Sequence, residues 1–159
     1  RPTAVVRVDN GSFAYAFDWY SRFAESDEAA RADVANEDRL VAAFGRSQPA
    51  ELKRNDGRQR GWIGPTDSIL GPDRDKGHFV PHSIGGALEI NLFVQERKLN
   101  RGWSPTGKAY RAIEHYCLKH PGTFFFNRPI YADGSAQPAM LEVGIVTADG
   151  VLGVDRFEN

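Results

Sequence analysis

Two groups of strand-like segments lie toward the two ends of this chain, and they limit its fold more than any other feature. Near one end, residues 3–9 and 12–20 are rich in apolar residues and are joined by Asn10-Gly11, a dipeptide typical of tight hairpin turns. Toward the other end, residues 123–131, 140–147 and 151–157 have the same character, and Asp149-Gly150 joins the last two. Because hairpin-connected strands are antiparallel, we predict an α+β fold with a mainly antiparallel sheet.

Helical signals lie between these two groups. Ser26 followed by two acidic residues resembles a helix N-cap, and the alanine-rich residues 29–44 carry apolar side chains at helical spacing, which predicts one helix or two short ones. Ser104 followed by Pro105 places a capping residue before a proline at the first helical position. A helix over 108–119 follows from this signal and from the apolar spacing after it.

The length and composition indicate a single soluble domain over residues 1–159. A hydrophobic content of 41% is enough to fill a core, and no repeat or linker divides the chain. No apolar run reaches the roughly 18 residues of a membrane span. Residues 46–74 are rich in Pro, Gly, Asp, Asn and Arg, which predicts a long, mostly irregular surface segment. The chain starts at Arg1 without a leader, so we expect an excised or processed domain whose own targeting signal is not visible.

The charges are unevenly distributed along the chain. Residues 45–128 hold 14 Lys and Arg against 8 Asp and Glu, a net charge of +6, whereas the segments on either side have net charges of −3 and −4. A basic surplus confined to the middle is expected if that region binds a polyanion such as a nucleic acid. The alternative, in which Arg54, Arg58 and Arg60 only solvate a loop, stays open.

The chain has one cysteine, Cys117, which excludes an internal disulfide and a cysteine-rich zinc site. Its place within the predicted helix favours a small buried apolar side chain over a catalytic thiol.

The side chains that are candidates for catalysis and metal binding are concentrated after residue 74. His78 follows Asp75-Lys76-Gly77, and two carboxamides, Asn91 and Asn100, lie nine residues apart. A histidine beside a cation can activate water, and a hard metal ion that keeps several waters needs as little as one carboxamide oxygen from the protein. We expect His78 at the start of a short strand over 79–81, with these groups acting on a phosphate.

Three other histidines have simpler explanations. His82 lies four residues after His78, but that spacing shares a face only on a helix, and Pro81 makes a helix unfavourable there. His115 and His120 lie on or just after the predicted helix, where solvation or the helix dipole accounts for them.

The carboxamides and the nearest acid also have alternatives. Asn91 is placed to cap the helix that carries the later asparagine, and Asn100 followed by Arg-Gly is typical of a helix end. Glu114 is placed either to hold metal-bound water or to form a surface ion pair with Arg111 or Lys108.

This part of the chain resembles the DNA/RNA non-specific endonuclease family, which belongs to the ββα-metal (His-Me finger) nucleases. The resemblance lies in residues 75–86, Asn91, residues 99–102 and residues 110–114. The family signature is Asp-Arg-Gly-His followed by two asparagines. The resemblance covers residues 75–120 best, extends over the C-terminal β meander at 123–157, and is poor over the first 70 residues. The chain departs from the signature at Lys76, where lysine supplies charge without the bidentate fork of arginine.

The resemblance implies a role for each residue. His78 would be the general base that deprotonates water, Asn100 the direct ligand of Mg²⁺ (or Mn²⁺), and Lys76 a phosphate contact. Asn91 would support the histidine or the metal shell, and Glu114 would hold metal-bound water. Because water attacks, and not a ribose hydroxyl, the resemblance implies hydrolysis of both DNA and RNA to 5′-phosphate ends.

Several biological settings fit this prediction. The chain is expected to be secreted or delivered into a target cell, either as the C-terminal toxin module of a larger bacterial protein, with a cognate immunity or inhibitor protein, or as a free secreted nuclease. A nucleic-acid-binding module that has lost turnover is the alternative function, and Lys76 is the sequence hint for it.

Overall fold

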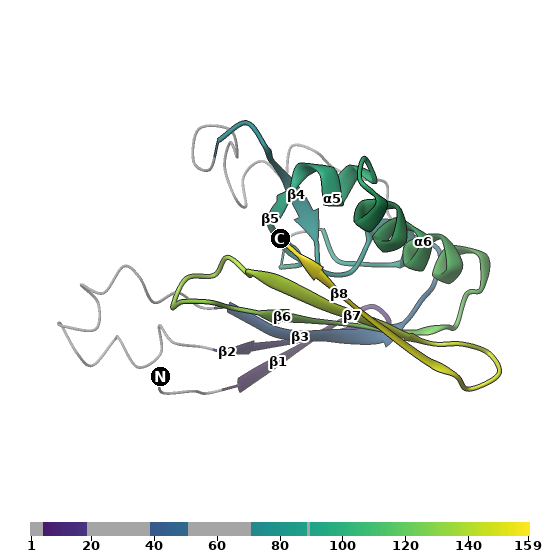
Figure 1. Cartoon of the computed structure of the whole chain (residues 1–159). Coiled ribbons are helices and arrows are strands. Elements are labelled where there is room, and N and C mark those ends of the chain that lie inside the picture. Colours follow the sequence, from purple (N-terminus) through teal and green to yellow (C-terminus); the bar gives the residue numbers. More distant parts are fainter. Residues whose placement is uncertain (1–4, 19–38, 51–70, 89) are drawn as a thin grey trace.

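The computed structural model describes residues 5–18, 39–50, 71–88 and 90–159 (Figure 1). The described elements are β1 (Val5–Asn10), β2 (Phe13–Asp18), β3 (Arg39–Arg46), β4 (Arg74–His78), the 3₁₀ turn η1 (His82–Ile84), β5 (Leu92–Glu96), α5 (Arg97–Arg101), α6 (Pro105–Lys119), β6 (Phe124–Ile130), β7 (Met140–Val146) and β8 (Leu152–Glu158).

Six of the described strands form the main sheet, in the order β1-β2-β3-β6-β7-β8, and every neighbouring pair is antiparallel. β4 and β5 form a separate two-stranded antiparallel sheet. The structure therefore confirms the α+β class with a mainly antiparallel sheet. The predicted single domain over 1–159 extends beyond the described residues and stays a prediction.

The hairpins that the turn dipeptides predicted are present. β1 and β2 pair with Asn10 opposite Phe13, and Gly11 in the turn has a φ of 61°, a conformation that glycine adopts without strain. The C-terminal meander of β6, β7 and β8 lies within a residue or two of the predicted bounds, and Gly150 in its last turn also has positive φ.

The prediction of helix over 29–44 is wrong where the structure describes it. Residues 39–46 form β3, which pairs with β2 on one side and β6 on the other. The spacing of Leu40 and Phe44 fits a helix, but a site between two strands gains ladder hydrogen bonds on both edges, and this tertiary gain outweighs the helix propensity of alanine. Residues 29–38 lie outside the described residues.

The chain leaves the main sheet after β3 and returns to it at β6. The segment between them carries β4, β5, α5 and α6, which lie together on one face of the six-stranded sheet (Figure 1). One continuous cluster of buried side chains joins this layer to the sheet, with members that include Phe13, Tyr15, Phe79, Phe93, Leu99, Tyr110, Phe125, Leu141 and Phe157. The edge-to-face contact of Tyr110 on Phe157, with ring centroids 5.2 Å apart, packs α6 onto β8.

The predicted helix over 108–119 is confirmed and begins slightly earlier, at Pro105. Ser104 caps it, because its Oγ accepts a hydrogen bond from the Gly107 N–H at 2.9 Å. Cys117 is buried and free, as expected of an apolar filler. Of the predicted irregular segment, 46–50 and 71–73 hold no helix or strand beyond the end of β3, and 51–70 lie outside the described residues. No helix in the described part of the chain is long and apolar enough to span a membrane.

Candidate active site

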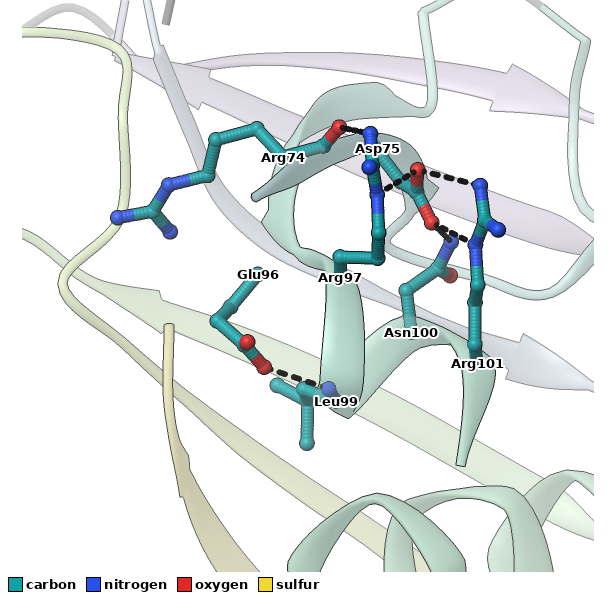
Figure 2. A network of polar contacts seen from close by, with 7 residues as sticks. All are labelled: Arg74, Asp75, Glu96, Arg97, Leu99, Asn100 and Arg101. Carbon is teal, nitrogen blue, oxygen red and sulfur yellow. Dashed lines mark hydrogen bonds and ion pairs between the residues drawn. The ribbon is translucent and has the colours of Figure 1, made fainter. Parts of the chain in front are cut away.

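β4, β5 and α5 form one compact unit, which we call the β4–β5–α5 unit. β4 and β5 pair with His78 opposite Leu92, and α5 begins at Arg97, directly after the end of β5. Glu96 ends the strand and caps the helix, because its carboxylate accepts a hydrogen bond from the Leu99 N–H at 2.6 Å (Figure 2). With no connecting residue between strand and helix, the direction of α5 is fixed by β5.

His78 is the last residue of β4 and is half-buried. Strand alternation places it on the same face as Lys76 and Arg74. The prediction that His78 begins a strand over 79–81 is wrong: the strand lies before His78, and the chain then turns away into a loop. Beyond His78 the backbone N–H and carbonyl oxygen of Val80 bond the Asn91 side chain and not a neighbouring strand, and Pro81 has no N–H to donate to a ladder.

The loop after His78 carries the second histidine of this region, His82. His82 begins the η1 turn, and its Nδ1 lies 3.4 Å from the Gly86 carbonyl oxygen. His78 lies on a strand and His82 on a 3₁₀ turn, so the two do not share a helix face, in agreement with the sequence argument against a two-histidine pair.

Asn91 is completely buried and holds this loop closed. Its Oδ1 accepts a hydrogen bond from the Val80 N–H at 2.7 Å, and its Nδ2 donates to the carbonyl oxygens of Val80 at 2.5 Å and Ala87 at 3.0 Å. Its backbone oxygen also accepts from the Phe79 N–H at 2.9 Å. The alternative that Asn91 caps the following helix is wrong, because Glu96 caps α5. Asn91 instead fixes the chain that leaves His78.

Asp75, next to Lys76 on β4, is the centre of a polar network on α5 (Figure 2). Arg101 donates to both of its carboxylate oxygens at 2.6 and 2.9 Å, and Arg97 Nε donates at 3.0 Å. Asn100 Nδ2 donates to Oδ2 at 3.3 Å. Burial acts to raise the pKa of Asp75, but the hydrogen bonds from Arg101, Asn100 and Arg97 outweigh it, so the pKa lies below its ordinary value.

Asn100 lies on the last turn of α5, which ends at Gly102 in a left-handed conformation. The interpretation of Asn100 and the two residues after it as a helix end is therefore confirmed. The amide nitrogen of Asn100 faces the Asp75 carboxylate, and its oxygen is turned away from it (Figure 2). That oxygen is the atom that a hard cation would use.

Glu114 on α6 contacts the loop after His78. Its Oε1 accepts a hydrogen bond from Ser83 Oγ at 2.6 Å, and its Oε2 lies 3.2 Å from Arg111. The ion pair with Arg111 was one of the two sequence alternatives and is present. A role in holding metal-bound water stays a prediction. Tyr110, one turn earlier, places its hydroxyl 3.4 Å from the His78 carbonyl oxygen.

Sequence reasoning missed three polar residues that fix this layer to the main sheet. Asn127 on β6 is fully buried and donates from Nδ2 to the Phe79 carbonyl oxygen at 2.8 Å. Tyr15 on β2 accepts from the Ala87 N–H at 2.9 Å, and burial raises its pKa to about 12. Asn159 donates to the Val94 carbonyl oxygen at 3.0 Å and accepts from the backbone N–H of β5's last residue at 2.9 Å.

A signal for one of these residues was present in the sequence. Asn127 occupies the inward position of a strand whose other inward residues are apolar, and a buried carboxamide is costly unless it is hydrogen-bonded. Its partner lies 48 residues away in the sequence, so the pattern alone does not identify it.

The described polar side chains around α5 include a carboxamide oxygen but no thiol. Among the described residues, no group of three or more His, Cys, Asp or Glu is placed to hold a metal. A carboxamide oxygen with waters completing the shell is acceptable to Mg²⁺ or Mn²⁺, which prefer oxygen ligands. Asn100, whose oxygen is turned away from Asp75, carries such an oxygen, and its role as a metal ligand stays a prediction.

Comparison with known proteins shows a likeness in fold. No family model matches the sequence, and no curated protein sequence matches it. A solved structure, that of the Sda1 nuclease with a bound zinc ion, matches with a TM-score of 0.50. The match has 16% sequence identity and covers 80% of this chain and 71% of that chain. The chain therefore shares an overall fold with a nuclease.

Proposed function

We propose that this chain is a metal-dependent endonuclease that hydrolyses phosphodiester bonds of DNA and RNA and leaves 5′-phosphate ends. One observation carries the proposal: a single β4–β5–α5 unit holds His78 at the end of a strand and Asn100 on the helix that follows its partner strand. This is a strand–strand–helix order of the kind that the ββα-metal resemblance predicts. The likeness to the fold of a nuclease supports the same conclusion.

In this proposal the protein supplies a base, a cation and a metal ligand from one rigid unit. The imidazole of His78 takes the proton from the attacking water, a step to which a positioned base contributes about 10² to 10⁴ in rate. Lys76, on the same face of β4, binds a phosphate oxygen. Asn91 positions the chain beside His78, and Glu114 orients water.

The proposed metal site uses the Asn100 oxygen, with Mg²⁺ or Mn²⁺ as the ion. When bound, the ion would stabilise the negative charge that develops on phosphate and leaving oxygen. The nuclease with the similar fold binds zinc, so zinc is a third ion to compare.

Substrate binding is expected to rest on phosphate contacts. The middle of the chain has the basic surplus, and part of it lies on the two described helices, with Lys98 and Arg101 on α5 and Lys108 and Arg111 on α6. Binding through phosphates is insensitive to base sequence and weakens as salt rises.

The experiment is cleavage of supercoiled plasmid and of total RNA by wild type and by His78→Ala, each with Mg²⁺, Mn²⁺, Zn²⁺ or EDTA. Wild type should cut both substrates only with a divalent ion, and the variant should be slower by about 10² to 10⁴. His115→Ala, an exposed histidine on α6, is the matched control and should keep wild-type activity.

The alternative function would appear in the same experiment. Lys76 in place of arginine favours a module that binds nucleic acid without turnover. Salt-sensitive binding with no cleavage under any ion would support that module and overturn the proposed hydrolysis. Lys76→Arg would then be the first variant to test for recovered cleavage.

The proposed setting is outside the producing cell, by secretion or delivery into a target cell, with a cognate inhibitor protein made by the producer. The support is the family resemblance of residues 75–120. A gene for a small acidic protein directly downstream, whose product blocks cleavage, is the expected finding for a toxin module. Cleavage that is insensitive to every neighbouring gene product would favour a free secreted nuclease.

A further inference from the structure

We propose that Asp75 is a positioning residue that sets which end of the Asn100 carboxamide faces the metal site. This inference rests on the proposed function, in which Asn100 is the direct metal ligand. Asp75 itself is held by arginines and would act on a bound metal only through Asn100.

The geometry places the two side chains in direct contact. Asn100 Nδ2 lies 3.3 Å from Asp75 Oδ2, and the Asp75 side chain is only 12% exposed (Figure 2). The contact joins β4 to α5 across 25 residues of sequence. It is therefore formed only when the whole β4–β5–α5 unit is assembled.

The chemistry of a carboxamide explains why this contact determines which way the Asn100 side chain faces. Its oxygen and its NH₂ group are similar in size, but only the oxygen binds a hard cation. An ionised carboxylate accepts hydrogen bonds and donates none, so the end of Asn100 that faces Asp75 is the NH₂ group. The oxygen is left on the opposite side, and the unfavourable flipped state of Asn100 would face two oxygens toward each other.

The two arginines explain why Asp75 acts as an anchor and not as a ligand. Arg101 occupies both carboxylate oxygens, at 2.6 and 2.9 Å, and Arg97 adds a bond at 3.0 Å while also donating to the Arg74 carbonyl oxygen at 2.9 Å. Two guanidinium groups keep the carboxylate charged and fixed on α5. Because the Asp75 carboxylate is fixed, its hydrogen bond also fixes the orientation of the Asn100 carboxamide.

The first test measures binding of Mn²⁺ by electron paramagnetic resonance to wild type, Asn100→Ala and Asp75→Asn. At position 75 the new carboxamide offers an NH₂ group, which attracts the oxygen of Asn100 and favours its flipped state. Loss of an outer partner of a metal ligand commonly weakens metal binding by about 10-fold to 100-fold, and we expect this range for Asp75→Asn.

A double variant tests the direction of the hydrogen bond. In Asp75→Asn combined with Asn100→Asp, the amide at position 75 donates to the carboxylate at position 100, which keeps an oxygen for the ion. Mn²⁺ binding by the double variant should exceed that of Asn100→Asp alone and should recover most of the roughly 10-fold to 100-fold loss expected for Asp75→Asn. Failure of this rescue, with the single variants weakened as expected, would contradict orientation as the cause.

Controls separate orientation from charge and from folding. Asp73→Asn removes an exposed acid two residues away and should leave Mn²⁺ affinity unchanged. An effect of charge alone would shrink as salt is raised, whereas an effect of orientation would persist. Circular dichroism of each variant checks that the unit is folded.

Nuclear magnetic resonance of the Asn100 side-chain amide gives a readout without metal or substrate. In wild type its NH₂ protons should exchange slowly because one of them is bonded to Asp75. If Asp75→Asn does not fold, this measurement on wild type is the test of the inference. Exchange of the Asn100 amide protons at the rate of a solvated amide would overturn it.

The remaining outcomes distinguish the two proposals. Full Mn²⁺ affinity in Asp75→Asn, with loss in Asn100→Ala, would overturn the inference and leave the metal site intact. Full affinity in Asn100→Ala would remove Asn100 as the ligand and would overturn both.

Discussion

The two sheets of this molecule are held in place by different kinds of contact. The six-stranded sheet has continuous ladders and an apolar face, with Phe13, Phe125, Leu141 and Phe157 buried on it. The β4–β5–α5 unit also buries apolar side chains, but a small number of hydrogen bonds from polar side chains fix it and the loop that follows β4. The stability of the main sheet is distributed over a large buried apolar surface and its strand ladders, whereas the geometry of the candidate site depends on a few individual hydrogen bonds.

This difference matters because apolar burial and hydrogen bonds fail differently. Removing buried methylene groups leaves a cavity that neighbours partly fill. Removing one partner of a buried hydrogen bond leaves the other unpaired, at a cost of about 1 to 3 kcal/mol for each group. The comparison predicts that substitutions in the unit disturb it locally, and that substitutions in the main sheet destabilise the whole protein.

Asn91→Ala should have the largest effect on the unit. It leaves the Val80 N–H and the Val80 and Ala87 carbonyl oxygens without this partner, so we expect a loss of about 4 kcal/mol. Hydrogen exchange should show the loss concentrated over 79–91, with amides of β6 and β7 still protected. The matched variant Leu141→Ala, in the main sheet, should cost about 3 kcal/mol and raise exchange everywhere. A uniform rise of hydrogen exchange over the whole protein in both variants would contradict this difference between the unit and the main sheet.

Gly77→Ala should be the next largest. A Cβ at Gly77 would clash with the side chain of Gln95, which is fully buried, so overpacking should cost about 1 to 3 kcal/mol in urea unfolding. Gly153→Ala on β8 is the control, because a Cβ there meets nothing within 4 Å. Equal effects at the two glycines would show that strand propensity, and not this contact, requires glycine in the Asp-Lys-Gly-His segment.

Acid should loosen the unit in a way that depends on Asp75. Its pKa in the folded protein lies below the value of about 3.9 in an unfolded chain. The stability that this carboxylate contributes is therefore complete above that value and is lost as the pH falls through the lower, folded value. In Asp75→Asn the unfolding free energy should change less between pH 5 and pH 2, as measured by urea titration at each pH. A parallel decline in both proteins would assign the acid sensitivity to other groups.

Arg156→Gln should have the smallest effect. Arg156 and Arg128 both contact Glu142 on the outer side of the main sheet, at 2.9 Å each. Exposed ion pairs contribute little and are screened by salt, so the thermal midpoint should hardly move and any shift should vanish at high salt. A large, salt-independent loss would mean that single polar contacts matter as much in the main sheet as in the unit.

The strands at the chain ends and α6 could be predicted because their signals are local. Asn10-Gly11 specifies a hairpin and Ser104-Pro105 specifies a helix start, whatever packs against them. β3 could not, because its helix-like composition is overruled by two neighbouring strands, one of them distant in sequence.

The candidate residues were found by their types and spacing, but their surroundings were not. His78 and Asn100 lie on the same β4–β5–α5 unit, while the contacts of Asp75 with α5 and of Asn127 with Phe79 cross 22 to 48 residues of sequence. Such contacts follow from how elements pack in space, which no local pattern records. The chemical roles of the candidate residues stay predictions.

The pairing of β3 with β6 has a consequence for the order of events during synthesis. β6 emerges from the ribosome only after β4, β5 and both described α-helices. β3 therefore lacks its second neighbouring strand at a stage when the candidate site residues have already been translated. Asn127, which anchors the loop beside His78, arrives at the same late moment. A nascent chain that has not yet reached Phe124 therefore has the site residues without their support, and the site is assembled only once β6 has been made.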